Sequence, residues 1–293
     1  MLNLSSSSLC LLTFLNTTTL LVHTHDFVQV AIIEDKRLDE SSGLAISYTH
    51  PGAVWLHNDS GAAAELFLVG MDGRTQAVVR LPSAKAVDWE DMCSFRTADQ
   101  SWLLIGDIGD NERARSQTQR PCTLYLLKEP VVPRANGVPT ITWNVSATIR
   151  FEFEDGSADC ESVAVDTERQ EILLLTKTSP QKNGLYRLPL DLETPEQMLT
   201  AKKIASPFIP FATALDVSPS GRTMVVCSML NALVVTRTPS QSWTDAFASP
   251  GLAMDLPPRK QGETICFDQT GQWLYVNSET PRQPLWRVKL PAN

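Results

Sequence analysis

Five segments of this 293-residue chain repeat one pattern, and this repetition limits the possible folds more than any other feature. The segments read SGLAIS, EDMCSF, ESVAVD, TALDVS and ETICFD, and they begin at Ser42, Glu90, Glu161, Thr213 and Glu263. They follow one another about every 50 residues, with one longer interval between the second and the third. Repeats of this length are typical of proteins built from similar units that stack or close into a ring.

Each repeat contains further apolar runs that read as short strands. A second run follows each start, as in AVWLHN and EILLLT, and a third follows the second, as in ELFLV and GLYRL. The first four repeats add a weaker fourth run, which reads AVVRL, ATIRFEF, LTAKKIA and SWTDAFA. These runs are rich in Val, Leu and aromatic residues, turn residues bound them, and no stretch keeps a helical period.

Four strands in each repeat predict an all-β chain folded as a five-bladed β-propeller. The fifth repeat ends without room for an outer strand, so we expect residues 27–34 to supply that strand and close the last blade. A six-bladed ring is the alternative, with the extra blade in the longer interval. We favour five blades because residues 106–122, within that interval, are rich in Gly, Asp, Asn, Arg and Gln and read as a loop.

The N-terminus differs from the rest of the chain. Residues 9–22 are apolar but too few for a stable membrane span, and the polar HTHD follows them. We expect a signal peptide at residues 1–24 and a single β-propeller domain at 25–293, in a secreted or periplasmic protein. The alternatives are a mis-assigned start or a disordered tail, because no Lys or Arg precedes the apolar run and no A-x-A site follows it.

Charge and cysteine content exclude some classes of protein. The net charge of −8 argues against nucleic-acid binding, which needs a basic face, and is compatible with a cation site. The five cysteines beyond the leader form no close pair, so we expect small buried apolar residues rather than disulfides or a zinc site.

The first strand of each repeat is expected to line the central channel, with alternate side chains on one face. At the first repeat position every residue carries an oxygen: Ser42, Glu90, Glu161, Thr213 and Glu263. Two residues earlier the rim is partly acidic, and two residues later every residue is apolar. Carboxylates this close would repel one another unless a cation neutralised them, and calcium takes six to eight oxygen ligands. We therefore predict a calcium ion on the channel axis; the alternative is that the acids cap strands or accept hydrogen bonds from backbone amides.

The order of these residues resembles the calcium-activated nucleotidases, the apyrase family of five-bladed propellers with an axial calcium. That family's ring runs Ser, Glu, Glu, Ser, Glu, and Thr213 here stands for the second Ser. ESVAVD looks like the family's third-blade Glu-Ser stretch, and NDSG at 58–61 lies where the family has Asp-Asp-Arg-Thr-Gly. The chain departs from the family there, because the arginine is missing, and at GDIGDN (106–111), which replaces a Lys-Glu-Trp region. The resemblance implies a calcium-dependent nucleotidase.

Loops after the second strands are expected to surround the channel mouth, where a rigid scaffold commonly carries chemistry. We predict that Asp59 or Asp107 acts as a general base or holds a water against the metal. The predicted substrate-binding residues are Asn58, Asp110, Asn111, Arg113 and Lys177. The competing interpretation is that these Asp, Asn and Gly residues only form turns.

Three functions remain open from the sequence. The first is a calcium-dependent hydrolase of phosphate esters or anhydrides. The second is a lactonase or esterase in which the metal polarises a carbonyl. The third is a non-catalytic propeller with a structural calcium. The expected partner is a small-molecule substrate, or a protein or glycan ligand at the channel mouth, with no nucleic acid and no stable membrane span.

Overall fold

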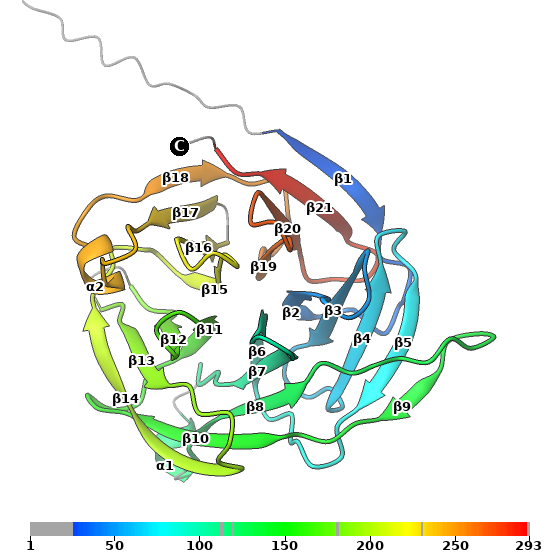
Figure 1. The fold of residues 1–293 in the computed structure, drawn as a ribbon, viewed down its shortest axis with the longest axis horizontal. Coiled ribbons are helices and arrows are strands. Elements are labelled where there is room, and N and C mark those ends of the chain that lie inside the picture. Colours follow the sequence, from blue (N-terminus) through cyan, green and yellow to red (C-terminus); the bar gives the residue numbers. More distant parts are fainter. Residues whose placement is uncertain (1–25, 112–113, 119, 180–181, 230, 292–293) are drawn as a thin grey trace, which may run out of the picture.

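The computed structural model describes residues 26–111, 114–118, 120–179, 182–229 and 231–291. It is an all-β structure in which mainly antiparallel sheets stand around a central axis (Figure 1). The described residues contain two short helices, α1 (Ala114–Thr118) and α2 (Trp243–Ala246). No helix among them is long and apolar enough to cross a membrane. The predicted signal peptide lies outside the described residues.

The strands form four hydrogen-bonded sheets. The first contains β2 (Ser41–Ile46), β3 (Ala53–Asn58), β4 (Glu65–Gly70), β5 (Thr75–Arg80) and β9 (Thr140–Thr142). The second, with eight strands, contains β6 (Trp89–Arg96), β7 (Ser101–Asp107), β8 (Cys122–Lys128), β10 (Ala147–Phe153), β11 (Cys160–Asp166), β12 (Glu171–Thr176), β13 (Leu185–Pro189) and β14 (Glu196–Ala205). The third contains β15 (Ala212–Val217), β16 (Thr223–Ser228), β17 (Asn231–Thr236) and β18 (Leu252–Asp255). The fourth contains β19 (Thr264–Phe267), β20 (Trp273–Asn277), β21 (Pro284–Lys289) and β1 (Phe27–Ile32).

Four of the five repeat starts lie on the innermost strands, and the fifth, Glu263, directly precedes its strand. β2 contacts β6, β6 contacts β11, β11 contacts β15, β15 contacts β19, and β19 contacts β2, so these strands close a ring around the axis (Figure 1). The apolar residues two positions after the repeat starts are buried, with exposed fractions of 0–1%: Leu44, Met92, Val163, Leu215 and Ile265. This confirms the expected apolar layer beneath the oxygen-bearing residues.

The first and the last described strands pair in one sheet. β1 pairs antiparallel with β21, and Phe27 lies opposite Val288. The N-terminal strand therefore supplies the outer strand that the last repeat lacks, as the sequence predicts.

Two sequence expectations differ from the structure. The run SWTDAFA forms α2 instead of a strand, because Ser242 caps the helix: its hydroxyl accepts from the backbone N–H of Asp245, whose carboxylate accepts from Ser242 in return. The outer strand of that sheet is β18. Residues 106–122 are only partly a loop, since they contain α1. The longer interval also holds β9, which lies beyond these residues and pairs parallel with β5.

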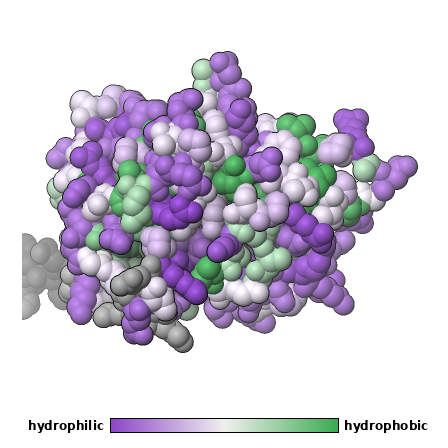
Figure 2. Space-filling model, turned by 90° about the horizontal axis from the view of Figure 1, so that it is seen from below, coloured by the Kyte–Doolittle hydropathy of each residue, from purple (hydrophilic) through white to green (hydrophobic). Residues whose placement is uncertain are grey.

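Neighbouring sheets pack apolar faces against each other. One cluster combines Trp55 and Leu66 of the first sheet with Trp89 and Tyr125 of the second. The described cysteines are all free and buried, which confirms their expected role as small core residues. Figure 2 shows a largely hydrophilic surface with scattered apolar residues, as expected for a molecule whose apolar residues fill the spaces between sheets.

Buried carboxylates also tie the inner strands together. Asp91 of β6 is fully buried, and its Oδ2 accepts hydrogen bonds from Val163 N of β11 at 2.9 Å and Leu215 N of β15 at 3.0 Å. Its other oxygen accepts from Met92 N. Asp91 is therefore a structural carboxylate that joins three inner strands, and Glu90 beside it belongs to the opposite face of the strand.

Candidate functional site

Three carboxylates lie close together, one directly after β3 of the first sheet and two at the start of β6 of the second sheet. One oxygen from each of Asp59, Asp88 and Glu90 lies within 4.8 Å of an oxygen from the other two. Asp59 follows β3, Asp88 precedes β6, and Glu90 is the second residue of β6. Glu90 is only 3% exposed, and no described residue donates a hydrogen bond to it or forms an ion pair with it. We call these three residues the carboxylate cluster; its oxygens could hold a hard divalent cation.

The GDIGDN loop packs its backbone against this cluster. The N–H groups of Ile108 and Gly109 donate to Asp88 O at 3.1 and 3.2 Å. A Cβ at Gly109 would lie 2.1 Å from Glu90 Oε1 and 2.5 Å from Asp88 Oδ2. Glycine is needed here because any side chain would occupy the space of the carboxylates.

The predicted ring residues are all buried near the beginnings of the five inner strands: Ser42, Glu90, Glu161, Thr213 and Glu263. Burial, and then the charge of Glu161, raise the pKa of Glu90 well above its usual value, and Glu263 adds to the effect. The three glutamates are thus close enough to repel one another, and a cation among them would lower their energy. The Thr213 hydroxyl donates to Gly262 O at 2.8 Å.

A lysine already lies among these carboxylates. Lys177 Nζ is 2.5 Å from Glu161 Oε2 and 4.0 Å from Glu263 Oε1. Burial raises the pKa of Glu161 to about 8, although Lys177 opposes that rise. The sequence predicts a substrate contact for Lys177, whereas the structure places its ammonium group in this ion pair.

Asp107 and Asp110 have structural partners. Asp107 Oδ1 accepts from Arg115 Nη2 at 2.6 Å and from Asp88 N at 2.9 Å, so it holds the segment that carries Asp88. Asp110 Oδ1 accepts from Arg115 N at 2.8 Å, while its buried Oδ2 has no partner among the described residues. Of the two carboxylates predicted as a general base, Asp59 is the one that joins the cluster.

The remaining predicted substrate-binding residues are placed differently. Asn58 Nδ2 donates to Arg37 O at 2.5 Å, so its side chain is bonded to the segment before β2. Asn111 is exposed and borders a cavity of about 430 Å³, together with Asp110 and Lys177. Arg113 lies outside the described residues.

Glu279 is a site residue that the sequence reasoning did not select. Its N–H donates to Gln261 O, just as the N–H of Asp59 donates to Glu40 O, so the two residues occupy equivalent places in different sheets. Burial, and then a hydrogen bond with Glu263, raise the pKa of Glu279 to about 8. The signal was available in the sequence, since Glu279 ends the second-strand run WLYVNSE.

One side of the mouth is apolar. Phe211 directly precedes β15, just as Asp88 directly precedes β6. Met229 directly follows β16, just as Asp59 directly follows β3. The exposed fractions of Phe208, Phe211 and Met229 are 74%, 52% and 42%. Phe211 also has a positive φ of 49°, which is unusual for a bulky residue. We call these three residues the apolar rim.

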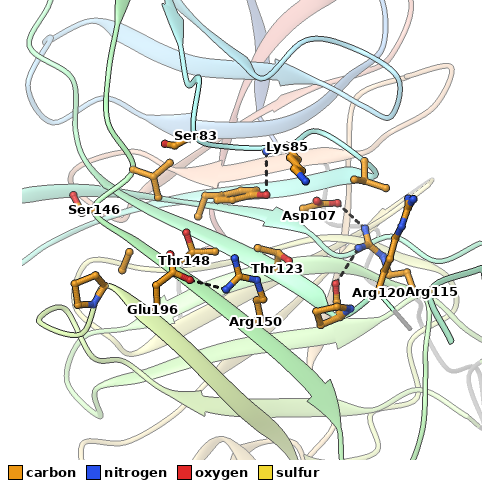
Figure 3. Close-up of a pocket in the computed structure, with 16 residues that line it drawn as sticks. Ser83, Lys85, Asp107, Arg115, Arg120, Thr123, Ser146, Thr148, Arg150 and Glu196 are labelled. Carbon is orange, nitrogen blue, oxygen red and sulfur yellow. Dashed lines mark hydrogen bonds and ion pairs between the residues drawn. The ribbon is translucent and has the colours of Figure 1, made fainter. Parts of the chain in front are cut away.

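A separate groove of about 510 Å³ lies on the side of the molecule, between β8, β10 and the loop before β6 (Figure 3). Its lining includes Lys85, Arg115, Arg120 and Arg150, so it is cationic in a chain of net charge −8. Two of these cations are paired, Arg115 with Asp107 and Arg150 with Glu196 (Figure 3). Arg115 and Arg120 also line a cavity of about 410 Å³ with Asp88 and Gly109, so the cationic groove lies next to one member of the carboxylate cluster.

Comparison with known proteins shows the fold alone. No family model matches the chain, and no curated protein is similar to it in sequence. A solved structure of a gluconolactonase from Xanthomonas campestris is similar, with a TM-score of 0.51 at 13% identity, over 91% of this chain and 90% of that one. The chain therefore shares a propeller-type fold with that protein.

Proposed function

We propose that the chain is a five-bladed β-propeller hydrolase that uses a calcium ion to open lactones or other carboxylic esters at the channel mouth. The observation that carries this proposal is the carboxylate cluster, in which Asp59, Asp88 and Glu90 lie close together and no Lys or Arg of the described residues is within 4 Å of their carboxylate oxygens. The similarity to a gluconolactonase supports the lactone class over the nucleotides that the ring order suggests.

The donor set fits calcium. All three side chains offer carboxylate oxygens, the ligands that hard cations prefer, and no His or Cys joins them. Glu90 is buried without a hydrogen bond, which is costly for a carboxylate that has no counter-ion. A bound calcium would polarise the substrate carbonyl and stabilise the negative charge that develops on its oxygen.

The residues around the cluster favour a neutral substrate. A phosphate would have to approach a mouth lined by several carboxylates, and Lys177 is already paired with Glu161. A lactone or ester carries no charge to repel. The apolar rim offers contact area for the hydrocarbon part of such a substrate.

Asp59 is the candidate general base. Its side chain is half-buried and so reachable by water, whereas Glu90 is enclosed. Burial raises the pKa of Asp59 to about 6 without a bound ion, and a calcium ion beside it would lower this pKa, so Asp59 would be ionised and able to accept a proton at neutral pH. In the reaction, Asp59 would take a proton from the attacking water, whose oxygen forms a bond to the carbonyl carbon. The C–O bond to the ring oxygen then breaks, and that oxygen receives the proton in the hydroxy-acid product.

An assay panel tests this proposal. The full chain is offered a γ-lactone, a δ-lactone, an aryl ester, p-nitrophenyl phosphate and ADP, with calcium and with chelator. We expect lactone or ester turnover that chelator abolishes, and at least a ~100-fold loss in Glu90→Gln, because that variant removes a metal ligand. Glu193→Gln, an exposed residue without side-chain partners in the described structure, is the matched control.

The other outcomes contradict the proposal in different ways. Turnover of ADP or p-nitrophenyl phosphate alone would replace the lactonase with a nucleotidase-like enzyme. No turnover, together with a melting temperature that still falls in chelator, would leave a binding propeller with a structural calcium. Export from the cell stays a prediction of the sequence, tested by N-terminal sequencing of the mature protein.

A further inference from the structure

Lys177 occupies a place that carboxylates occupy elsewhere at the mouth. Its N–H donates to Asp159 O, directly before β11, at 2.9 Å. The N–H groups of Asp59 and Glu279 make the equivalent bonds to the residues that lead into β2 and β19. The same backbone position therefore presents an acid in two sheets and a lysine in this one.

The lysine neutralises one side of the ring. Its Nζ is 2.5 Å from Glu161 and 4.0 Å from Glu263, and the lysine side chain is 21% exposed. Glu161 and Glu263 thus share a permanent cation that belongs to the chain.

The other side of the ring has no such cation. No Lys or Arg nitrogen among the described residues lies within 4 Å of a carboxylate oxygen of Asp59, Asp88 or Glu90. Glu90 is also buried without a hydrogen bond from a described residue, and the ammonium group of Lys177 is paired with Glu161 instead. Among the described residues, the ring therefore has one half that is ion-paired and another half that has no ion pair within 4 Å.

We infer that Lys177 is a built-in counter-ion that limits this ring to one divalent cation and directs it to Asp59, Asp88 and Glu90. This inference rests on the cation site of the proposed function. It differs from an axial ion shared by all five inner strands, because Glu161 and Glu263 are held by the lysine. An ion on the axis would lie close to the ammonium group, and their repulsion disfavours that position.

Removing the lysine should change how many ions bind. Lys177→Met keeps the length of the side chain and removes the ion-pair partner of Glu161, while Glu263 keeps its hydrogen bond with Glu279. We expect calorimetry with calcium chloride to give one ion per wild-type chain, and either two ions or at least ~10-fold tighter binding of one ion in Lys177→Met. Lys177→Arg keeps the charge and should bind one ion with nearly the wild-type affinity.

The matched control is Lys182→Met, which removes an equal charge from an exposed residue a few positions along the chain. It should bind calcium as the wild type does, so an effect of net charge alone would appear in both variants. Equal changes in both would overturn the inference. Lys177→Met could be too unstable for calorimetry without calcium. In that case the rise in melting temperature on adding calcium is measured instead, and it should be larger for Lys177→Met than for the wild type.

The results separate this inference from the proposed function. One ion in wild type and unchanged binding in Lys177→Met would overturn the role of Lys177 and leave the calcium site standing. No calcium binding to wild type, but binding to Lys177→Met, would overturn the calcium-dependent hydrolase and support the lysine as the resident cation. Failure of both proteins to bind calcium would overturn both statements.

Discussion

Glu129, just after β8, is a single buried carboxylate on which the packing of two sheets depends. It is 1% exposed, and Oε1 accepts from Ser47 Oγ at 2.5 Å and from Trp55 Nε1 at 2.9 Å. Oε2 accepts from the N–H groups of Tyr48 and Thr49, both at 3.1 Å. Four donors from the β2–β3 hairpin of the first sheet therefore converge on a carboxylate of the second.

Replacing Glu129 by Gln should lower the free energy of unfolding by about 3–5 kcal/mol. The amide oxygen can keep the two backbone donors, and the NH₂ group can donate to the Ser47 hydroxyl. The indole N–H of Trp55 then faces another donor and loses its partner, which costs about 1–3 kcal/mol. The remaining loss comes from replacing charge-assisted hydrogen bonds by neutral ones.

Urea unfolding followed by circular dichroism measures this change, with calcium held constant because a bound ion would alter stability by itself. Glu65→Gln is the control: Glu65 pairs with exposed Arg80 at 2.8 Å, and its loss should cost less than ~1 kcal/mol. A Glu129→Gln protein within ~1 kcal/mol of wild type would refute the reasoning, because the four donors would then not depend on the carboxylate.

Three further predictions concern the mouth and the core. Gly109→Ala should weaken calcium binding by at least ~10-fold, measured by calorimetry, because its Cβ would enter the space of Glu90 and Asp88; unchanged affinity would show that the loop does not approach them. Burial raises the pKa of Asp216 to about 7, above its usual 3.8, so the folded state binds the extra proton and stability should fall by up to ~4 kcal/mol as pH rises from 4 to 7 in chelator. Asp216→Asn should flatten this dependence, and an equal slope in both proteins would contradict the assignment. Phe211→Ala should raise KM for a lactone with a long alkyl chain by about 10-fold and leave an unsubstituted lactone unchanged, as steady-state kinetics would show; equal effects on both substrates would remove the apolar rim from the site.

The alternation of residues along the inner strands could be read from the sequence. A strand places every second side chain on one face, so the repeat starts at Glu90 and Glu161 predicted both the buried oxygen-bearing layer and the apolar layer beneath it. The pairing of β1 with β21 was predictable for a different reason. The fifth repeat lacks an outer strand, and the run before the first repeat has no other partner. The helix α2 was missed because a capping box outweighed the apolar content of a short run.

The partners of the charged side chains could not be read in this way. GDIGDN predicted a loop rich in acids, yet only the tertiary structure shows that Asp107 is bonded to Arg115 while Gly109 lies against Glu90. These contacts join residues on different strands and loops, and their distances depend on how the sheets turn about the axis. No local pattern contains that information.

The sequence by itself determined that three glutamates and two hydroxyl-bearing residues would be buried around one axis, because strand periodicity and equal repeats leave no other face for them. The tertiary structure decided which of those charges are already neutralised. Lys177 reaches Glu161 from the loop after β12, whereas no Lys or Arg in the described part of the chain lies within 4 Å of the carboxylate oxygens of Asp59, Asp88 and Glu90. The reason is physical: the Coulomb energy depends on the separation of charges in space, and the folding of the chain sets that separation.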